Sequence, residues 1–169
     1  DYLIGSGPML LGHGDPEVME AVLAQLPKGM TFFANNAAGI ELAEAICEAV
    51  PCCEQIRHLT SGGEADMYAM RLARAYTGKP KIVKFEGGYH GMCAEAQMSL
   101  APVREVNFPQ AVPDSAGIPT GVADEMLIAP FNDLAAVESL LAAHDDVAGL
   151  IVEPLQRIIP AEEGYLQGL

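Results

Sequence analysis

Basic side chains are scarce in this sequence, and their scarcity argues against several classes of partner. Only nine Lys and Arg stand against 23 Asp and Glu, so the formal net charge is -14 over 169 residues. Nucleic acids and anionic membrane surfaces are held by clustered Lys and Arg, whereas the few basic residues here are scattered. Long apolar runs are also missing, since a run such as 147–152 is far too short to span a bilayer. We therefore expect a cytoplasmic protein that binds neither nucleic acid nor membrane.

Cysteine usage excludes a disulfide framework and a zinc knuckle. The four cysteines show no C-x-x-C spacing, and the adjacent pair Cys52 and Cys53 suits neither kind of site. The histidines show no ligand-like spacing either, so we expect no metal. With 50% hydrophobic and 19% charged residues, the chain has the composition of an ordinary globular protein and is long enough for one well-buried domain.

Alternating strand and helix patterns predict an α/β fold with a mostly parallel sheet covered by helices. Strands are expected at 2–4, 55–60, 81–85, 125–129 and 148–152, and helices at 16–26, 39–50, 64–76 and after Asn132 or Asp133. The helix at 64–76 is expected to bury Ala65, Ala69, Leu72, Ala73 and Tyr76. The Pro-bearing stretch between the third and fourth strands is expected to be functional or to form an interface. Because the chain starts without Met and ends where another element begins, we expect a piece of a longer protein.

The segments that follow three of these strands contain the candidate chemistry. They are 61–65 (SGGEA), 86–91 (EGGYHG) and 153–156 (EPLQ). In open α/β sheets, ligands bind beyond the carboxyl ends of the strands. We therefore expect these three segments to converge on one ligand site.

Two interpretations of the first segment remain open at this point. Gly62 and Gly63 let the backbone turn tightly and expose N–H groups, and the positive end of the following helix favours a phosphate there. Ser61 and Glu64 are also spaced as a capping box, S-x-x-E, in which the two side chains satisfy the helix's own donors. The spacing alone is compatible with either a phosphate cradle or a simple cap.

Five further residues follow these strands, and ordinary structural roles also fit most of them. Tyr89, flanked by glycines, could stack on a planar ligand or be a core tyrosine at a turn. His90 could carry a proton or simply be structural. Glu153, at the end of a buried strand, needs a partner or a raised pKa, which fits an acid/base group as well as a cap or salt bridge. Gln156 offers an amide donor and acceptor nearby, whereas Arg157 could bind a carboxylate but better fits an exposed ion pair.

Several stretches together resemble the class III pyridoxal-phosphate aminotransferases. They are SGGEA at 61–65, RLARAYTG at 71–78, KFEGGYHG at 84–91 and VEP at 152–154. The opening GSGPMLLGH at 5–13 and the long loop after His90 are similar to the glutamate-1-semialdehyde aminomutase branch. The resemblance implies part of a fold-type-I pyridoxal-phosphate transferase. Residues 1–30 would belong to the small domain and its linking helix, and residues 31–169 to the N-terminal part of the cofactor-binding large domain, truncated at both ends.

The same resemblance implies a function and a set of site residues. The parent protein would be a pyridoxal 5'-phosphate enzyme, and a homodimer, that moves an amino group on an amino acid or amino aldehyde. The implied cofactor-binding residues are Ser61, Gly62, Gly63, Tyr89, His90, Glu153 and Gln156. A mobile gate is implied after Gly91. The catalytic lysine and the Asp that holds the pyridine nitrogen are expected beyond Leu169, so this chain alone should be inactive.

Two departures from the family pattern keep a second function open. Gly63 stands where the family commonly has Thr or Ser, so one hydroxyl contact to the phosphate is missing. The sequence QRII at 156–159 replaces a glycine-containing turn. Both changes fit a non-catalytic relative that retains the fold and an anion pocket as a binding or assembly protein. An unrelated nucleotide-binding domain is disfavoured because no G-x-G-x-x-G follows the first strand.

Overall fold

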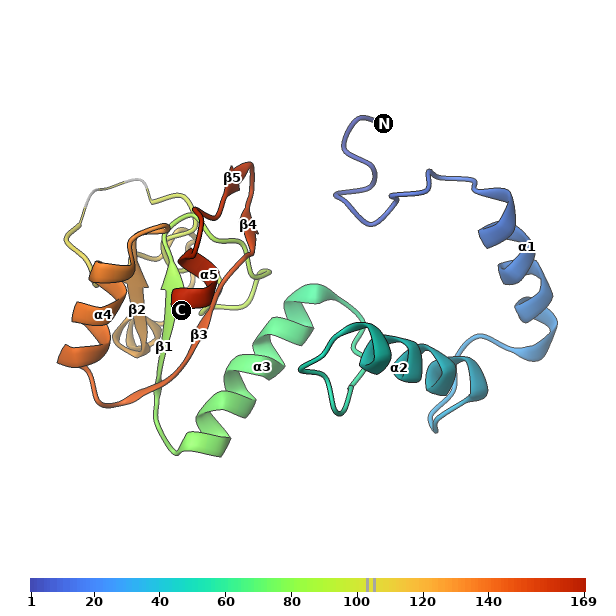
Figure 1. Ribbon diagram of the computed structural model, residues 1–169, viewed down its shortest axis with the longest axis horizontal. Coiled ribbons are helices and arrows are strands. Elements are labelled where there is room, and N and C mark those ends of the chain that lie inside the picture. The colour runs from blue at the N-terminus through green and yellow to red at the C-terminus, as the bar shows by residue number, and fades with distance from the viewer. Residues whose placement is uncertain (103, 105) are drawn as a thin grey trace. The chain divides into compact units, whose positions relative to one another are not determined.

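The computed structural model describes residues 1–102, 104 and 106–169, which form two compact units, 1–57 and 58–169. Figure 1 shows the elements of both units. The boundary between the units falls after Arg57, later than the domain boundary expected between residues 30 and 31. The assignment of the two parts to a small and a large domain stays a prediction.

The first unit contains two α-helices and a short 3₁₀ helix. α1 (Pro16–Gln25) begins after Asp15, whose carboxylate accepts hydrogen bonds from two backbone N–H groups of the first turn. η1 (Leu26–Lys28) follows directly, and α2 (Ala37–Ala49) begins after the capping residue Asn36. Both predicted helices are therefore present, and the second begins two residues earlier than expected.

Two predicted strands are wrong. Residues 2–4 form turns, because the Asp1 carboxylate accepts the N–H groups of Leu3 and Gly5 at 2.8 Å each, and Ile4 has a φ of 46° that an extended strand does not allow. Residues 55–60 belong to neither of the two described sheets. Their composition suits a strand, but a strand also needs a neighbour for its backbone hydrogen bonds, and no described strand pairs with this segment.

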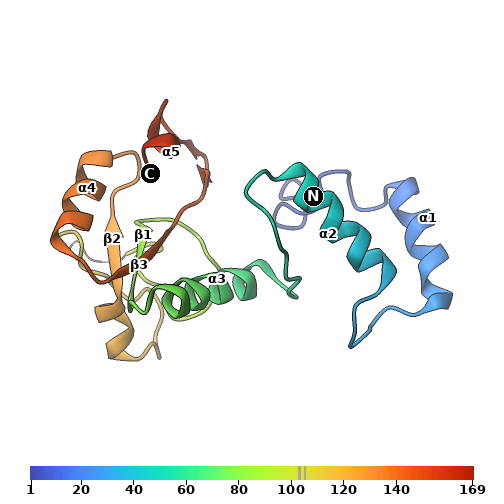
Figure 2. The ribbon, with the colours of Figure 1, turned by 60° about the horizontal axis from the view of Figure 1, so that its bottom comes forward.

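The second unit is built on a three-stranded parallel sheet in the order β2-β1-β3 (Figures 1 and 2). The central β1 (Lys81–Phe85) pairs with β2 (Met126–Ala129) on one side and with β3 (Val147–Ile151) on the other. The three strands predicted for this part are thus present. β1 and β2 are almost fully buried, whereas β3 is only half-buried, not covered on both faces as its apolar sequence indicated.

Alternation along β1 sends successive side chains to opposite faces of the sheet. On one face Val83 and Phe85 pack with α4 (Leu134–Ala143) and α5 (Tyr165–Gly168). The rings of Phe85 and Tyr165 meet edge to face, with their centroids 6.0 Å apart. One face of the sheet is therefore closed by helices from the C-terminal half of the chain.

On the other face lies α3 (Gly62–Thr77), which buries a different stripe from the predicted one. Met70 is buried and packs with Ile82 of β1. Ala73 is half-buried, but the other positions expected to be buried are exposed: Ala65, Ala69, Leu72 and Tyr76. The expected stripe and the stripe that contains Met70 and Ala73 both have helical spacing. The sequence periodicity alone therefore could not decide which stripe meets the sheet.

Parts of the long segment between β1 and β2, at 96–99 and 111–112, are buried. Ala96, Met98, Ala111 and Val112 are all at most 5% exposed. A 3₁₀ helix, η2 (Thr120–Glu125), then leads into β2. The expectation of a mobile gate after Gly91 stays a prediction, and residues 103 and 105 of the same segment lie outside the described residues.

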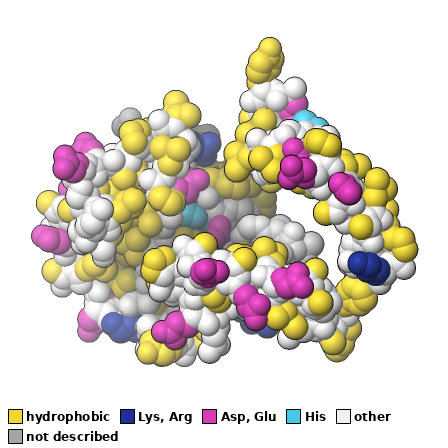
Figure 3. Space-filling model, turned by 45° about the vertical axis from the view of Figure 1, so that its right-hand side comes forward, with side chains coloured by type: hydrophobic (Ala, Val, Ile, Leu, Met, Phe, Trp, Pro, Cys, Tyr) yellow, Lys and Arg dark blue, Asp and Glu magenta, His cyan; other side chains and the backbone are white. Residues whose placement is uncertain are grey.

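After β3 comes a two-stranded antiparallel hairpin of β4 (Leu155–Gln156) and β5 (Ile159–Pro160). Asp and Glu side chains are spread over the face seen in Figure 3, as the excess of acidic residues leads one to expect. Within the described ranges, no helix is long and apolar enough to cross a membrane.

Candidate functional site

The first turn of α3 combines a helix cap with two free backbone donors. Ser61 Oγ accepts the N–H of Glu64 at 3.2 Å, and the Glu64 carboxylate accepts the N–H of Thr60 at 2.9 Å. The N–H groups of Gly62 and Gly63 have no hydrogen-bond partner among the described residues. They lie at the positive end of the helix. Capping and anion binding are therefore compatible, because the cap uses Ser61 and Glu64 and leaves the two glycine donors for a ligand.

Gly63 and Gly91 bring the helix start into contact with the loop after β1. A Cβ added at Gly91 would collide with the Gly63 Cα, and one added at Gly63 would lie 3.2 Å from the Gly91 Cα. Gly91 also has a φ of 91°, which L side chains rarely adopt. Gly62 differs, because a Cβ added there would meet nothing within 4 Å. The two backbones thus touch at Gly63 while Gly62 stays open.

The loop that contains Tyr89 forms the other wall of a cavity of about 600 Å³. Tyr89 is 48% exposed, and its N–H donates to Glu153 Oε2 at 3.1 Å. That hydrogen bond connects the segment after β1 to the segment after β3. The cavity is lined by Ser61, Gly62, Gly63, Glu64, Asp66, Met67, Tyr89, Gly91, Met92 and Cys93. The segments 61–65 and 86–91 therefore meet at one site, with Glu153 bonded to its wall.

Carboxylates and a neutral histidine set the electrostatics beside this cavity. The pKa of Asp66 is raised by burial and, to a lesser extent, by the negative charge of Glu153. His90 is 4% exposed, and its Nδ1 lies 3.8 Å from Asp66 Oδ2. Burial, helped by the positive charge of Lys84, lowers the pKa of His90 to about 4, so the imidazole is neutral at pH 7. Its Nε2 finds no hydrogen-bond partner within the described part of the chain.

Gln156 and Arg157 hold the loop of Tyr89 from the hairpin side. Gln156 is 5% exposed, and its Nε2 donates to the Glu86 carbonyl at 2.8 Å. Arg157 Nε donates to the Gly87 carbonyl, also at 2.8 Å. Neither side chain lines the cavity, so the altered sequence at 156–159 forms a brace for the loop.

Lys84 is the residue of this region that sequence reasoning missed. It lies in β1, is 1% exposed, and donates from Nζ to the Met98 carbonyl at 2.6 Å. Burial lowers its pKa to about 8, against the raising effect of carboxylates such as Asp114 and Glu153. The sequence did carry a signal for this role, namely a lysine inside an otherwise apolar strand. A buried ammonium needs hydrogen-bond acceptors, so such a lysine indicates a buried polar contact.

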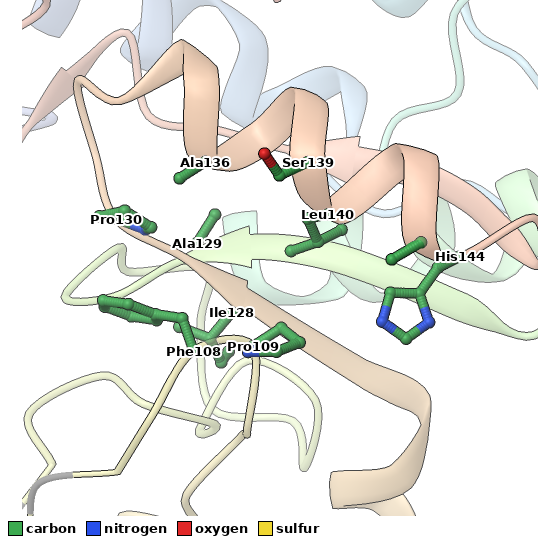
Figure 4. Close-up of a pocket in the computed structure, with 10 residues that line it drawn as sticks. Phe108, Pro109, Ile128, Ala129, Pro130, Ala136, Ser139, Leu140 and His144 are labelled. Carbon is green, nitrogen blue, oxygen red and sulfur yellow. The ribbon is translucent and has the colours of Figure 1, made fainter.

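A second cavity, of about 310 Å³, lies between α4, β2 and the turn at Phe108 and Pro109 (Figure 4). Its walls are mainly apolar. The Ser139 hydroxyl at its edge already donates to the Ala135 carbonyl at 2.8 Å. In the described residues, no group of three or more His, Cys, Asp or Glu side chains is arranged to hold a metal ion. The free donors of α3 therefore make the first cavity the candidate site.

Comparisons with known proteins agree along the whole chain. The family model for aminotransferase class-III matches residues 1–169. An omega-transaminase from Sphaerobacter thermophilus is 39% identical over 99% of this chain and 40% of its own, with a TM-score of 0.91. A structure described as a transaminase with PLP bound is 32% identical, over 99% of this chain and 39% of its own, with a TM-score of 0.90.

A glutamate-1-semialdehyde aminomutase from Pseudomonas aeruginosa PAO1 is also similar to this chain. It is 27% identical over 99% of this chain and 37% of its own, with a TM-score of 0.79. The chain therefore spans about two fifths of the length of these structures.

Proposed function

Because this chain belongs to the class-III aminotransferases, we propose that the whole protein moves an amino group with pyridoxal 5'-phosphate as its cofactor. The observation that carries the proposal is one cavity lined by Gly62 and Gly63, whose N–H groups have no hydrogen-bond partner among the described residues, and by Tyr89. A phosphate needs hydrogen-bond donors, and a planar ring needs a flat apolar partner. The cavity offers both, so its residues fit the two ends of this cofactor.

Each side of the cavity has a separate part in holding the cofactor. The N–H groups of Gly62 and Gly63 would bind phosphate oxygens at the positive helix end, while Ser61 keeps the first turn in shape. The Tyr89 ring would pack on the pyridine, and the bond from its N–H to Glu153 keeps the loop in place. Pyridoxal phosphate, when bound, supplies the electron sink that stabilises negative charge on the carbon next to the amino group.

His90 and Gln156 are proposed to support the loop that contains Tyr89. His90 is buried and neutral at pH 7, so it adds no charge to the site. Gln156 holds the Glu86 carbonyl and thereby the start of the loop. Direct contact of either residue with the cofactor stays a prediction.

The two departures from the family pattern each have a structural counterpart near the cavity. A side chain at Gly63 would have little room against the Gly91 backbone. This steric limit explains why the Thr or Ser that is common at this position in the family is replaced by glycine. The other departure, at 156–159, forms the hairpin that braces the loop. Both departures are therefore accounted for without loss of the anion site.

The remaining parts of the proposal concern the whole protein. We expect the lysine that bonds the cofactor, and the Asp beside the pyridine nitrogen, beyond Leu169, and we expect a homodimer in the cytoplasm. The proposed substrate is an amino acid or amino aldehyde. The higher identity to the omega-transaminase than to the aminomutase favours transfer between two molecules.

An absorbance titration of the whole protein with pyridoxal phosphate tests this function. We expect a new visible band that borohydride removes, together with transfer of the amino group from an amino acid to a 2-oxo acid. Gly62→Val serves as the site variant, because its side chain would extend into open space and leave the protein contacts intact. A protein that shows no reducible band and no transfer would contradict the proposal.

A further inference from the structure

A short buried segment, residues 97–99 (the anchor segment), holds both ends of the loop at 87–91 (the aromatic loop). At one end, the Ser99 carbonyl accepts the Gly87 N–H at 2.8 Å. At the other end, Gln97 Nε2 donates to the Gly91 carbonyl at 3.2 Å. The place of the aromatic loop, and of Tyr89 within it, therefore depends on the place of the anchor segment.

Lys84 connects the anchor segment to the sheet. Its Nζ donates to the Met98 carbonyl at 2.6 Å, and both residues are at most 1% exposed. A buried ammonium is costly unless its donors are used, which makes this contact a strong and directional one. Ser99, the next residue, has a φ of 48°, a conformation that a non-glycine residue keeps only when its surroundings enforce it.

Other contacts also hold the anchor segment, but they reach different parts of the unit. The Ser99 N–H donates to the Val112 carbonyl at 2.7 Å, and the chain near Val112 reaches β2 through the bridge from Gln110 to Leu127. The hydrogen bond from Lys84 ties the anchor segment directly to β1, from which the aromatic loop itself continues, and Met98 also packs in one apolar cluster with Ile82 of β1.

We propose that Lys84 is a positioning residue, whose ammonium fixes the anchor segment against β1 and thereby sets the place of Tyr89 at the cavity. This inference rests on the proposed function, because the place of Tyr89 matters for a ligand only if a ring stacks on it. The charged groups around Lys84 come from several elements. The carboxylates of Glu86, Asp114 and Glu153 favour the ammonium, and Arg157 opposes it.

Hydrogen exchange of single backbone amides tests the inference directly. In Lys84→Met we expect the amides of Gly87 and Tyr89 to exchange roughly tenfold faster, because the loop opens locally once its anchor is loose. The amide of Val83, inside the sheet, should keep its protection. Lys81→Met is the matched control, since Lys81 lies on the same strand but forms a partly exposed ion pair with Asp146 at 2.9 Å.

A conservative variant and a ligand measurement complete the test. Lys84→Arg keeps a charged donor and should restore slow exchange at Gly87 and Tyr89. The dissociation constant for pyridoxal phosphate should rise roughly tenfold in Lys84→Met and stay unchanged in Lys81→Met. A merely structural role would instead speed exchange at all core amides alike.

Two outcomes would overturn the inference: unchanged exchange at Gly87 and Tyr89 in Lys84→Met, or equal acceleration at Val83. If Lys84→Met does not fold, Lys84→Gln replaces it, because its shorter neutral amide cannot reach as far and leaves no buried charge. The inference is then tested by comparing amide exchange at Gly87 and Tyr89 in Lys84→Gln with that in Lys84→Arg. Failure of the unsubstituted protein to bind pyridoxal phosphate would refute the proposed function alone, since the exchange pattern is measured without ligand.

Discussion

Replacing Gly91 by Ala should force apart the two walls of the cavity. The new Cβ would collide with the Gly63 Cα, and the φ of 91° is unfavourable for an L side chain. The backbone conformation costs about 1–2 kcal/mol, and an extra methyl group in a close contact costs about 1–3 kcal/mol more. We therefore expect Gly91→Ala to lower the free energy of unfolding by roughly 2–5 kcal/mol, a large part of the stability of a typical domain.

Gly117→Ala is the matched control for this experiment. Gly117 has a φ of 86°, but a Cβ added there would meet nothing within 4 Å. It should therefore lose only the conformational part, about 1–2 kcal/mol. Urea unfolding followed by circular dichroism measures both variants. Equal losses in the two variants would refute the reasoning that a backbone contact at Gly63 joins the helix start to the loop.

Three further predictions concern the residues around the cavity. Tyr89→Ala should weaken pyridoxal-phosphate binding roughly tenfold by calorimetry while Tyr89→Phe, which keeps the ring, should not; equal weakening would argue against stacking. The folded-state pKa of His90 lies at about 4 against an ordinary 6.5, so the stability from neutral His90 is complete above pH 6.5 and is lost as the pH falls towards 4. Urea unfolding across this range should show that loss, and His90→Gln should reduce it; identical profiles would contradict the assignment. Glu153→Gln should lower the pKa of Asp66 in a carbon NMR titration, because one of its two raising causes is removed; an unchanged pKa would leave burial as the whole cause.

The sheet of the second unit could be predicted because its strands are short apolar runs bounded by turn residues. The runs KIVKF, MLIA and VAGLI each become a strand of the parallel sheet. The segments at 2–4 and 55–60 were also predicted as strands but have no described partner strand, and pairing is not a local property. In α3 the buried stripe could not be chosen locally either, because it depends on which side meets β1.

In the candidate site too, some features could be recognised from the local sequence, whereas others depend on contacts between residues far apart in the chain. Gly63 and Gly91 mark a tight backbone approach, and both lie in segments that the sequence singled out and that line the cavity. Lys84 was missed because its acceptor, the Met98 carbonyl, lies 14 residues further along the chain in a segment without regular structure. The bracing role of Gln156 was missed because its partner, the Glu86 carbonyl, is 70 residues away in sequence.

Binding of pyridoxal phosphate to the unsubstituted protein and to Gly62→Val tests the central claim most directly. The claim is that the open donors at Gly62 and Gly63 hold the phosphate of the cofactor, in a cavity shared with Tyr89. We predict at least a roughly tenfold rise in the dissociation constant for Gly62→Val, at an unchanged melting temperature, because the added side chain enters open space without disturbing protein contacts. Equal affinity of the two proteins would contradict this placement of the site.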